Sequence, residues 1–264
     1  MLVRQTGTLQ CPDTERADGH RGRAGAARWQ RELHCALPET LQAENGRGLK
    51  GRDYMCTRFY VEPAYYAPII TRAQKVKLAD DMMRHLSKPL TMSGEMRPTD
   101  VAAVLAPNKE GNVSVFPMIW GFSHEATDAP IVNCRLETAS QKEMWKDSWF
   151  RRRCVIPCSW YFEWEHFRSP DGKRSKVGDK YLIQPKGAES TLLAGLYRIE
   201  ERRGLQVPVF SVLTRNAVGD LRGIHDRMPL ILRREDIAAW VRPDGNPQEI
   251  AEKGLTEMCF EKAQ

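Results

Sequence analysis

The sequence has no long apolar run and no export signal. No apolar run in the 264-residue chain approaches the length of roughly 18 residues that a membrane-spanning helix needs. We therefore expect no membrane partner. The first thirty residues are arginine-rich and lack an apolar core, which excludes a secretory signal peptide and favours the cytoplasm. The absence of an internal repeat and of a glycine-rich phosphate loop argues against a repeat protein and a P-loop enzyme.

Regular cysteine spacing is also missing. The chain has an odd number of cysteines, at positions 11, 35, 56, 134, 154, 158 and 259. This argues against a disulfide scaffold, and thiols in a cytoplasm stay reduced. Cys154 and Cys158 are spaced C-x3-C with His166 nearby, but no second pair follows at a spacing typical of zinc sites. We therefore expect no metal site and no cofactor.

Apolar residues make up 41% of the chain and aromatic residues 8%, enough to bury a core. Lysine plus arginine number 40 against 34 acidic residues, which gives a formal charge of +6. This balance mildly favours a polyanionic partner, although both signs are abundant.

Residues 1–54 differ in composition from the rest. They contain seven glycines, one valine, no isoleucine or phenylalanine, and eight arginines beside a single lysine. Such a segment cannot bury enough apolar surface to offset its ordering entropy. It is either a disordered basic tail or upstream sequence translated from the wrong start, and the break in composition at Met55 favours the second interpretation.

Residues 55–264 have the pattern of one folded domain. The predicted helices are Thr71–Ser87, Thr138–Arg152 and Arg234–Val241. The predicted strands are Cys56–Glu62, Val101–Leu105, Val113–Phe122, Cys154–Trp164, Tyr181–Gln184, Leu192–Glu200, Val207–Leu213 and Met228–Leu232. Many strands with few intervening helices predict a mainly antiparallel α+β domain.

Cys56 follows a methionine, and a small second residue normally permits removal of that methionine. A mature chain beginning with Cys56 would carry an α-amine with a pKa near 8, partly neutral at pH 7. An aldehyde captured by this amine as an imine can be closed by the neighbouring thiol into a five-membered thiazolidine. The alternative is a buried structural cysteine at the start of a strand.

Three further segments carry polar groups suited to chemistry. Asn133 and Arg135 are two apart on an extended segment, so they share a face and could hold a phosphate or carboxylate. Glu163 lies among aromatic residues, where burial suits a carboxyl group to acid–base work, and Trp164 offers a stacking face. His225 sits in a charged loop before a strand, where Asp226 or Arg227 could orient it. Each segment also fits an ordinary structural role.

Together these groups suit covalent chemistry on an aldehyde carried by an anionic polymer, and they equally suit a Cys–His hydrolase. The inventory of residues alone does not choose between the two.

Five motifs follow one another along the chain: M-C-x-R-F, W-G-F, N-x-R-x-E-T, C-x-x-P-C-x-W-Y-x-E-W and I-H-D-R-M-P. In this order they resemble the SRAP family, the SOS-response-associated peptidases also called abasic-site processing proteins. The match runs from Met55 to about Val241. Each motif is short, but their order and spacing together are highly specific.

The resemblance implies a compact α+β fold with a barrel-like core and a groove for single-stranded DNA. It implies a covalent crosslink to abasic sites and a possible self-cleaving peptidase activity. The site residues carried over by motif are the catalytic Cys56, Asn133, Glu163 and His225, and the DNA-contacting Arg58, Trp120, Arg135, Arg153, Trp164 and Thr214. We expect a monomer whose partner is single-stranded DNA containing abasic sites, nucleoid-associated when bound to it.

Two features depart from the family pattern. Cys56 is internal in the full chain, so it has no α-amine unless translation starts at Met55 or the extension is cleaved. Thr57 occupies the slot where glycine is expected. The competing hypotheses are a cysteine peptidase using Cys56 and His225 with Glu163 or Asn133, and a non-covalent binder of single-stranded DNA.

Overall fold

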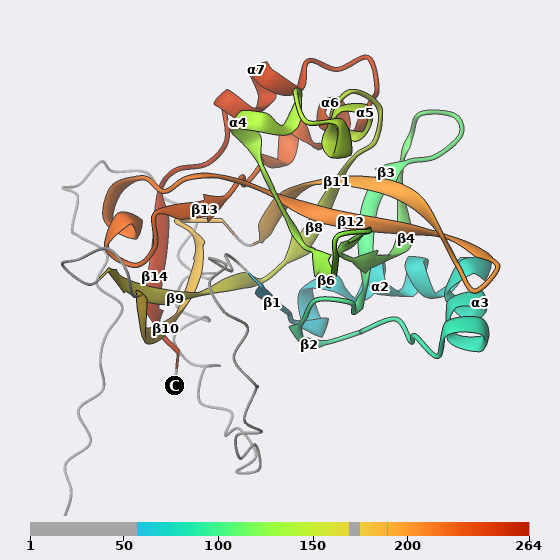
Figure 1. Cartoon of the computed structure of the whole chain (residues 1–264), viewed down its shortest axis with the longest axis horizontal. Helices are drawn as coiled ribbons and strands as arrows, with labels where there is room; N and C mark the ends of the chain where they lie inside the picture. The colour runs from blue at the N-terminus through green and yellow to red at the C-terminus, as the bar shows by residue number, and fades with distance from the viewer. Residues whose placement is uncertain (1–56, 169–174, 189, 264) are drawn as a thin grey trace, which may run out of the picture. The chain divides into compact units, whose positions relative to one another are not determined.

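The computed structural model describes residues 57–168, 175–188 and 190–263 of the chain (Figure 1). Its centre is a five-stranded barrel in which each strand pairs with two others of the set. The strands, in order around the barrel, are β11 (Thr191–Arg202), β8 (Arg153–Cys158), β3 (Val101–Pro107), β4 (Val113–Trp120) and β12 (Leu205–Asn216). The pairing of β11 with β12 closes the circle. The barrel-like core expected from the sequence is confirmed.

Two short strands extend the barrel sheet beside β12. They are β7 (Asn133–Arg135), which pairs in parallel, and β13 (Arg227–Pro229), which pairs antiparallel. A small hairpin is formed by β5 (Phe122–His124) and β6 (Thr127–Ile131).

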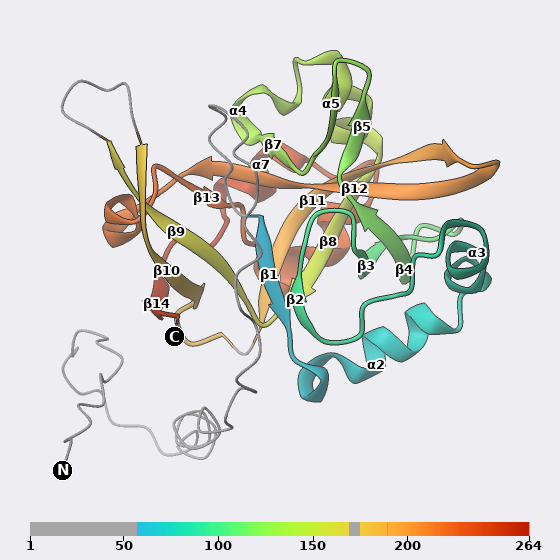
Figure 2. The same cartoon turned by 60° about the horizontal axis from the view of Figure 1, so that its bottom comes forward.

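A second sheet of five strands lies beside the barrel (Figure 2). Its order is β14 (Met258–Lys262), β10 (Ser175–Pro185), β9 (Trp160–Arg168), β1 (Arg58–Val61) and β2 (Gly94–Met96). All its pairings are antiparallel. The β9 strand is central in this sheet, which fixes its backbone from both sides.

Six α-helices flank the sheets in the described part of the chain. They are α2 (Pro63–Gln74), α3 (Lys77–Leu86), α4 (Leu136–Ala139), α5 (Glu143–Arg151), α6 (Ile237–Val241) and α7 (Pro247–Glu252). Two 3-10 turns, η1 (Gly219–Gly223) and η2 (Arg234–Asp236), complete the elements. Figure 1 shows α4 to α7 gathered on the same side of β11 and β12. None of the described helices combines the length and apolarity needed to span a bilayer.

The strand β8 packs against apolar residues on both of its faces. Every residue of β8 is buried. Cys154, Ile156 and Cys158 belong to one hydrophobic cluster, whereas Val155 belongs to a second cluster that includes Trp149 of α5 and Trp240 of α6. Alternate side chains of a strand point to opposite faces, so the helices cover the outer face of β8.

The structure confirms the α+β class but corrects several element boundaries. The predicted helix Thr71–Ser87 is two helices, because Val76 is extended and α2 already begins at Pro63, a favourable first residue. The predicted helix Thr138–Arg152 is likewise divided into α4 and α5. The predicted strand Cys154–Trp164 is interrupted at Ser159, between β8 and β9.

Candidate functional site

Two sequence-predicted residues, Glu163 and His225, meet in the structure. Glu163 lies on β9 and is 2% exposed, and His225 lies between η1 and β13 and is 4% exposed. His166, further along β9, joins them. One side-chain nitrogen or oxygen from each of the three residues lies within 4.8 Å of the others. A buried carboxyl group and two imidazoles therefore share one small volume.

The β9 strand holds Glu163 by pairing on both edges. Glu163 pairs with Tyr181 of β10, and its neighbour Phe162 pairs with Arg58, the first residue of β1. The backbone N–H of Trp164 donates to the Glu163 Oε1 atom at 3.2 Å. The carboxyl group is thus fixed on a central strand rather than on a loop.

A backbone hydrogen bond ties the His225 loop to β9. The His166 N–H donates to the Ile224 carbonyl at 2.9 Å, and the His225 N–H donates to the Leu221 carbonyl at 3.0 Å. The rings of His166 and His225 meet edge to face, with centroids 4.7 Å apart. Figures 1 and 2 both show β9 beside the chain that leads into β13.

The His225 Nδ1 atom has two neighbours. One can form a hydrogen bond only when Nδ1 carries no proton, and the other only when Nδ1 is protonated. The Arg227 N–H donates to Nδ1 at 3.0 Å, which requires Nδ1 to carry no proton. An Asp226 carboxylate oxygen lies 3.1 Å from the same atom, and it forms a hydrogen bond only when Nδ1 is protonated. The site can therefore stabilise His225 both with and without a proton on Nδ1.

Arg227 clamps the loop that carries His225. Its guanidinium donates to both Glu137 carboxylate oxygens at 2.5 and 2.8 Å, to Asn216 Oδ1 at 2.6 Å and to the Thr214 carbonyl at 2.8 Å. The hydrogen bond from Arg227 lowers the pKa of Glu137. The clamp fixes β13 against α4 and the end of β12. Sequence reasoning missed this pair, although Glu137 and Arg227 each lie within a motif.

Asn133 and Arg135 share a face of β7, as predicted. Cys134 between them is buried, Asn133 is half-buried and Arg135 is exposed. The strand lies parallel to β12, with Arg135 paired to Thr214. Thr214 is fully buried and donates from its hydroxyl group to the Cys134 carbonyl at 3.4 Å. Thr214 therefore supports the Arg227 clamp and is closed to a nucleic acid, which corrects its predicted DNA contact.

Arg58 and Trp164 lie on the face of the second sheet opposite to Glu163, because Arg58 is paired with Phe162 and side chains alternate along β9. The Arg58 Nε atom lies 3.0 Å from Glu95, which also binds Lys180 at 2.8 Å. The Lys180 ammonium lies 3.8 Å from the centre of the Phe162 ring and 5.3 Å from that of the half-buried Trp164. Cys56, two residues before Arg58, lies outside the described residues.

The prediction that Trp120 contacts DNA is wrong, because Trp120 is a core residue. It has no exposed surface, packs against Phe59 and Phe210, and donates from its indole N–H to the Val132 carbonyl at 3.1 Å. The next residue, Gly121, has φ +115°, and a Cβ atom there would lie 2.5 Å from Pro130. The W-G-F motif therefore specifies a turn and a core contact.

The prediction that Arg153 contacts phosphate is also wrong. Arg153 is 1% exposed, and its guanidinium donates to five backbone carbonyls, those of Trp149, Phe150, Trp240, Arg242 and Gly245. These carbonyls lie at the ends of α5 and α6 and just beyond, where helical carbonyls lack partners. Burial lowers the pKa of Arg153 to about 10. Arg153 joins two helices to β8.

Replacing Arg153 with methionine should destabilise the fold strongly. The change leaves buried carbonyls without donors, so we expect a loss of about 3–5 kcal/mol in the free energy of unfolding. Arg135→Met, on the exposed end of β7, should change it by no more than about 0.5 kcal/mol. Urea unfolding of the two variants measures the difference. Equal midpoints would contradict the role assigned to Arg153.

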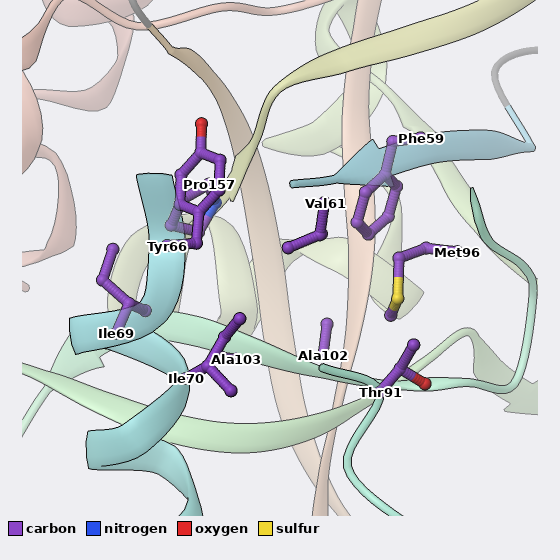
Figure 3. A pocket seen from close by; sticks show the side chains of 10 residues that line it. All are labelled: Phe59, Val61, Tyr66, Ile69, Ile70, Thr91, Met96, Ala102, Ala103 and Pro157. Atoms are coloured by element: carbon purple, nitrogen blue, oxygen red, sulfur yellow. The ribbon is translucent and has the colours of Figure 1, made fainter. Parts of the chain in front are cut away.

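An apolar pocket lies on the opposite face of β1 from Arg58 (Figure 3). Phe59 and Val61 face it, together with residues of α2 and β3. Its Tyr66 hydroxyl donates to the Cys158 carbonyl, and burial raises the pKa of Tyr66. The lining offers packing rather than reactive groups, so we assign the pocket to the core.

Cys154 and Cys158 do not form half of a zinc site. Both are buried in β8, and burial raises the pKa of each thiol. Four residues of a strand span about 13 Å, too far for two ligands of one ion.

Comparison with known proteins finds relatives of this chain. Abasic site processing protein YedK of Escherichia coli is 28% identical over 160 residues, covering 59% of this chain and 65% of YedK. Abasic site processing protein YoaM of Bacillus subtilis is 27% identical over 142 residues, covering 52% of this chain and 60% of YoaM. The chain thus aligns with less than two thirds of the length of these relatives.

Solved structures show the same fold. A crystal structure of a protein from Bacteroides thetaiotaomicron superimposes with a TM-score of 0.60 at 21% identity, covering 79% of this chain and 92% of that one. The profile of the family described as SOS response associated peptidase (SRAP) matches residues 55–263. Because this match spans most of the chain and includes every motif above, the chain belongs to the SRAP family.

Proposed function

We propose that this protein captures abasic sites in single-stranded DNA and crosslinks to them through Cys56 as the N-terminal residue. The observation that carries the proposal is the buried pair of Glu163 and His225 beside the start of β1. Arg58 pairs with Phe162, next to Glu163, and Cys56 precedes Arg58 by two residues. The proposal requires a terminal Cys56 to reach this pair. Relatives named abasic site processing proteins support the choice of substrate.

The proposed chemistry needs a free α-amine on Cys56. We propose that translation begins at Met55, or that residues 1–54 are cleaved, so that the thiol and the amine share one terminal residue. An amine of this kind has a pKa near 8, against about 10.4 for lysine, and part of it is neutral at pH 7.

The reaction forms two bonds and releases one water. The Cys56 amine adds to the C1′ aldehyde of the opened abasic sugar, giving a carbinolamine. Glu163 donates a proton to the leaving hydroxyl and recovers one from the nitrogen, so that water departs and the imine forms. The Cys56 thiolate adds to the imine carbon, while His225 takes the thiol proton and returns a proton to nitrogen. The product is a thiazolidine, with no change in oxidation state.

Exposed and half-buried side chains on the strands next to β9 and β12 supply the proposed DNA contacts. Arg135 is exposed on the same face of β7 as Asn133, and Arg58 and Trp164 share the face of the second sheet opposite to Glu163. Guanidinium groups bind phosphates without reading sequence, and an indole ring stacks on any unpaired base. Arg153 and Trp120 take no part, because the core holds both.

The proposal is tested by mixing two proteins, one beginning at Met1 and one at Met55, with single-stranded DNA containing one abasic site. We expect a denaturation-resistant gel shift with the Met55 protein, whose intact mass begins at Cys56. The Met1 protein should give no shift unless it has lost its extension, because an internal cysteine has no α-amine. Single-stranded DNA with an intact base at the same position is the matched control.

The outcomes separate the competing functions. A shifted Met1 protein that retains its full mass would overturn the amine mechanism. No shift with either protein, but release of peptides that depends on Cys56, would favour a cysteine peptidase. Salt-sensitive binding without any covalent adduct would leave a plain single-strand binder.

A further inference from the structure

His166 is the half-buried member of the cluster, and the proposed reaction does not use it. It lies on β9, three residues after Glu163, and its ring contacts His225 edge to face. Its backbone N–H is bonded to Ile224, so the strand and the loop are held at a fixed separation. We propose that Glu163, His166 and His225 form a binding site for a divalent metal ion with the preferences of zinc.

The three donors match the chemistry of such an ion. Two imidazoles and one carboxylate, with one position left open, are a common ligand set of zinc. Zinc–ligand bonds of about 2.0–2.1 Å place tetrahedral ligand atoms roughly 3.3 Å apart. The donor atoms here lie within 4.8 Å of one another, so modest side-chain rotations bring them onto one ion. This combination differs from the cysteine pair that the sequence placed beside His166.

Asp226 supplies the outer support that a metal-bound histidine needs. Its carboxylate oxygen lies 3.1 Å from the His225 Nδ1 atom. A protonated Nδ1 that donates to this carboxylate leaves the Nε2 lone pair for an ion, an arrangement that orients and strengthens metal-ligating histidines. In the alternative state, Nδ1 accepts the Arg227 N–H. Metal binding is therefore coupled to the choice between these two hydrogen bonds.

Metal in this site and the proposed crosslinking exclude each other. The ion takes the lone pairs of Glu163 and His225, which the reaction needs for proton transfer. This second part rests on the proposed function, whereas the binding site itself does not.

The binding site is tested on the full chain after removal of metal with a chelator. We expect calorimetric titration with Zn²⁺ to give one tight site, and Co²⁺ to give the visible absorption of a tetrahedral ion that Zn²⁺ displaces. His166→Ala should weaken Zn²⁺ binding about 100-fold or more, because it removes a direct ligand. Asp226→Asn should weaken it about 10–100-fold, as outer-shell changes do.

His85→Ala is the matched control, since His85 is exposed on α3. It should bind Zn²⁺ as the unchanged chain does. Equal affinity in the His166→Ala and His85→Ala proteins would overturn the site, as would the absence of a tight site in the unchanged chain. Unfolding temperatures of all variants, measured without metal, show whether a weakened affinity reflects loss of the fold. Glu163→Gln, which keeps the side-chain shape, provides a second test of Zn²⁺ binding.

The exclusion is tested separately with the Met55 protein and abasic single-stranded DNA. We expect crosslinking in the presence of chelator and at least a tenfold slower reaction when Zn²⁺ saturates the protein. The ratio of the two rates should fall towards one in the His166→Ala protein. Unchanged rates on saturation would overturn the exclusion. Failure to crosslink even with chelator would sink the proposed function, while the calorimetric result would stand by itself.

Discussion

Cys56→Ala in the protein that begins at Met55 is expected to abolish the heat-stable adduct with abasic DNA. The variant keeps an α-amine, which still forms an imine with the aldehyde, but it has no thiol to close the ring. Imine formation is reversible in water. A thiol two carbons from the amine closes the thiazolidine ring readily, because the reaction is intramolecular and its effective concentration is large. The measurement is the yield of denaturation-resistant adduct on a gel.

Borohydride reduction separates the thiol from the amine in this experiment. Reduction should trap a covalent adduct with the Cys56→Ala protein, because its amine still forms the imine. It should trap none with an intact Met1 protein, in which residue 56 has no α-amine. A heat-stable adduct of the Cys56→Ala protein without reduction would contradict the thiazolidine, and trapping by the intact Met1 protein would point to a lysine or to the α-amine of its own first residue.

Some of the residues predicted to form the site lie together in the structure, and two different causes bring them together. Glu163 and His225 meet because β9 and the loop before β13 are held together by the bond between His166 and Ile224. Asn133 and Arg135 share a face because a strand alternates. The alternation along a strand is readable from the chain alone, whereas the contact between β9 and the His225 loop is not.

The errors involve residues whose environment depends on distant parts of the chain. Arg153 was expected to bind phosphate, yet carbonyls near the ends of α5 and α6 take its donors. Trp120 was expected to meet DNA, yet Phe59 and Phe210 enclose it. A motif combines residues that build the fold with residues that serve function, and burial is what separates them. The positions of charged and aromatic residues in the sequence do not show which of them the fold buries.

Burial and distance along the chain also decide which elements of the fold can be predicted. Apolar runs predicted most of the barrel strands, because their burial on both faces produces long hydrophobic segments. The break between α2 and α3 was not predicted, because the extended residue at the break is Val76. Valine, unlike glycine or proline, does not mark the end of a helix in the sequence. The strand β14 was missed because its residues are only half-buried and its partner β10 is distant in sequence.

Glu163→Gln should slow crosslinking by about 10²–10⁴-fold, the usual contribution of a positioned general acid or base. This corresponds to roughly 3–5 kcal/mol in the activation barrier. Glutamine keeps the shape and can still accept the hydrogen bond from the Trp164 N–H, so the change removes proton transfer and little else. The measurement is the single-turnover rate of adduct formation by the Met55 protein, with chelator present.

The matched control is Glu110→Gln, the same chemical change at an exposed position in the turn between β3 and β4. It should crosslink at the unchanged rate. A Glu163→Gln protein with normal affinity for abasic DNA and a normal unfolding temperature, but a much slower reaction, places the carboxyl group in the chemical steps. If instead the rate is unchanged, water or His225 alone supplies the proton, and the burial of Glu163 serves the fold. Because Glu163 is 2% exposed, an unchanged rate should then be accompanied by a change in stability, which distinguishes the two roles in one pair of proteins.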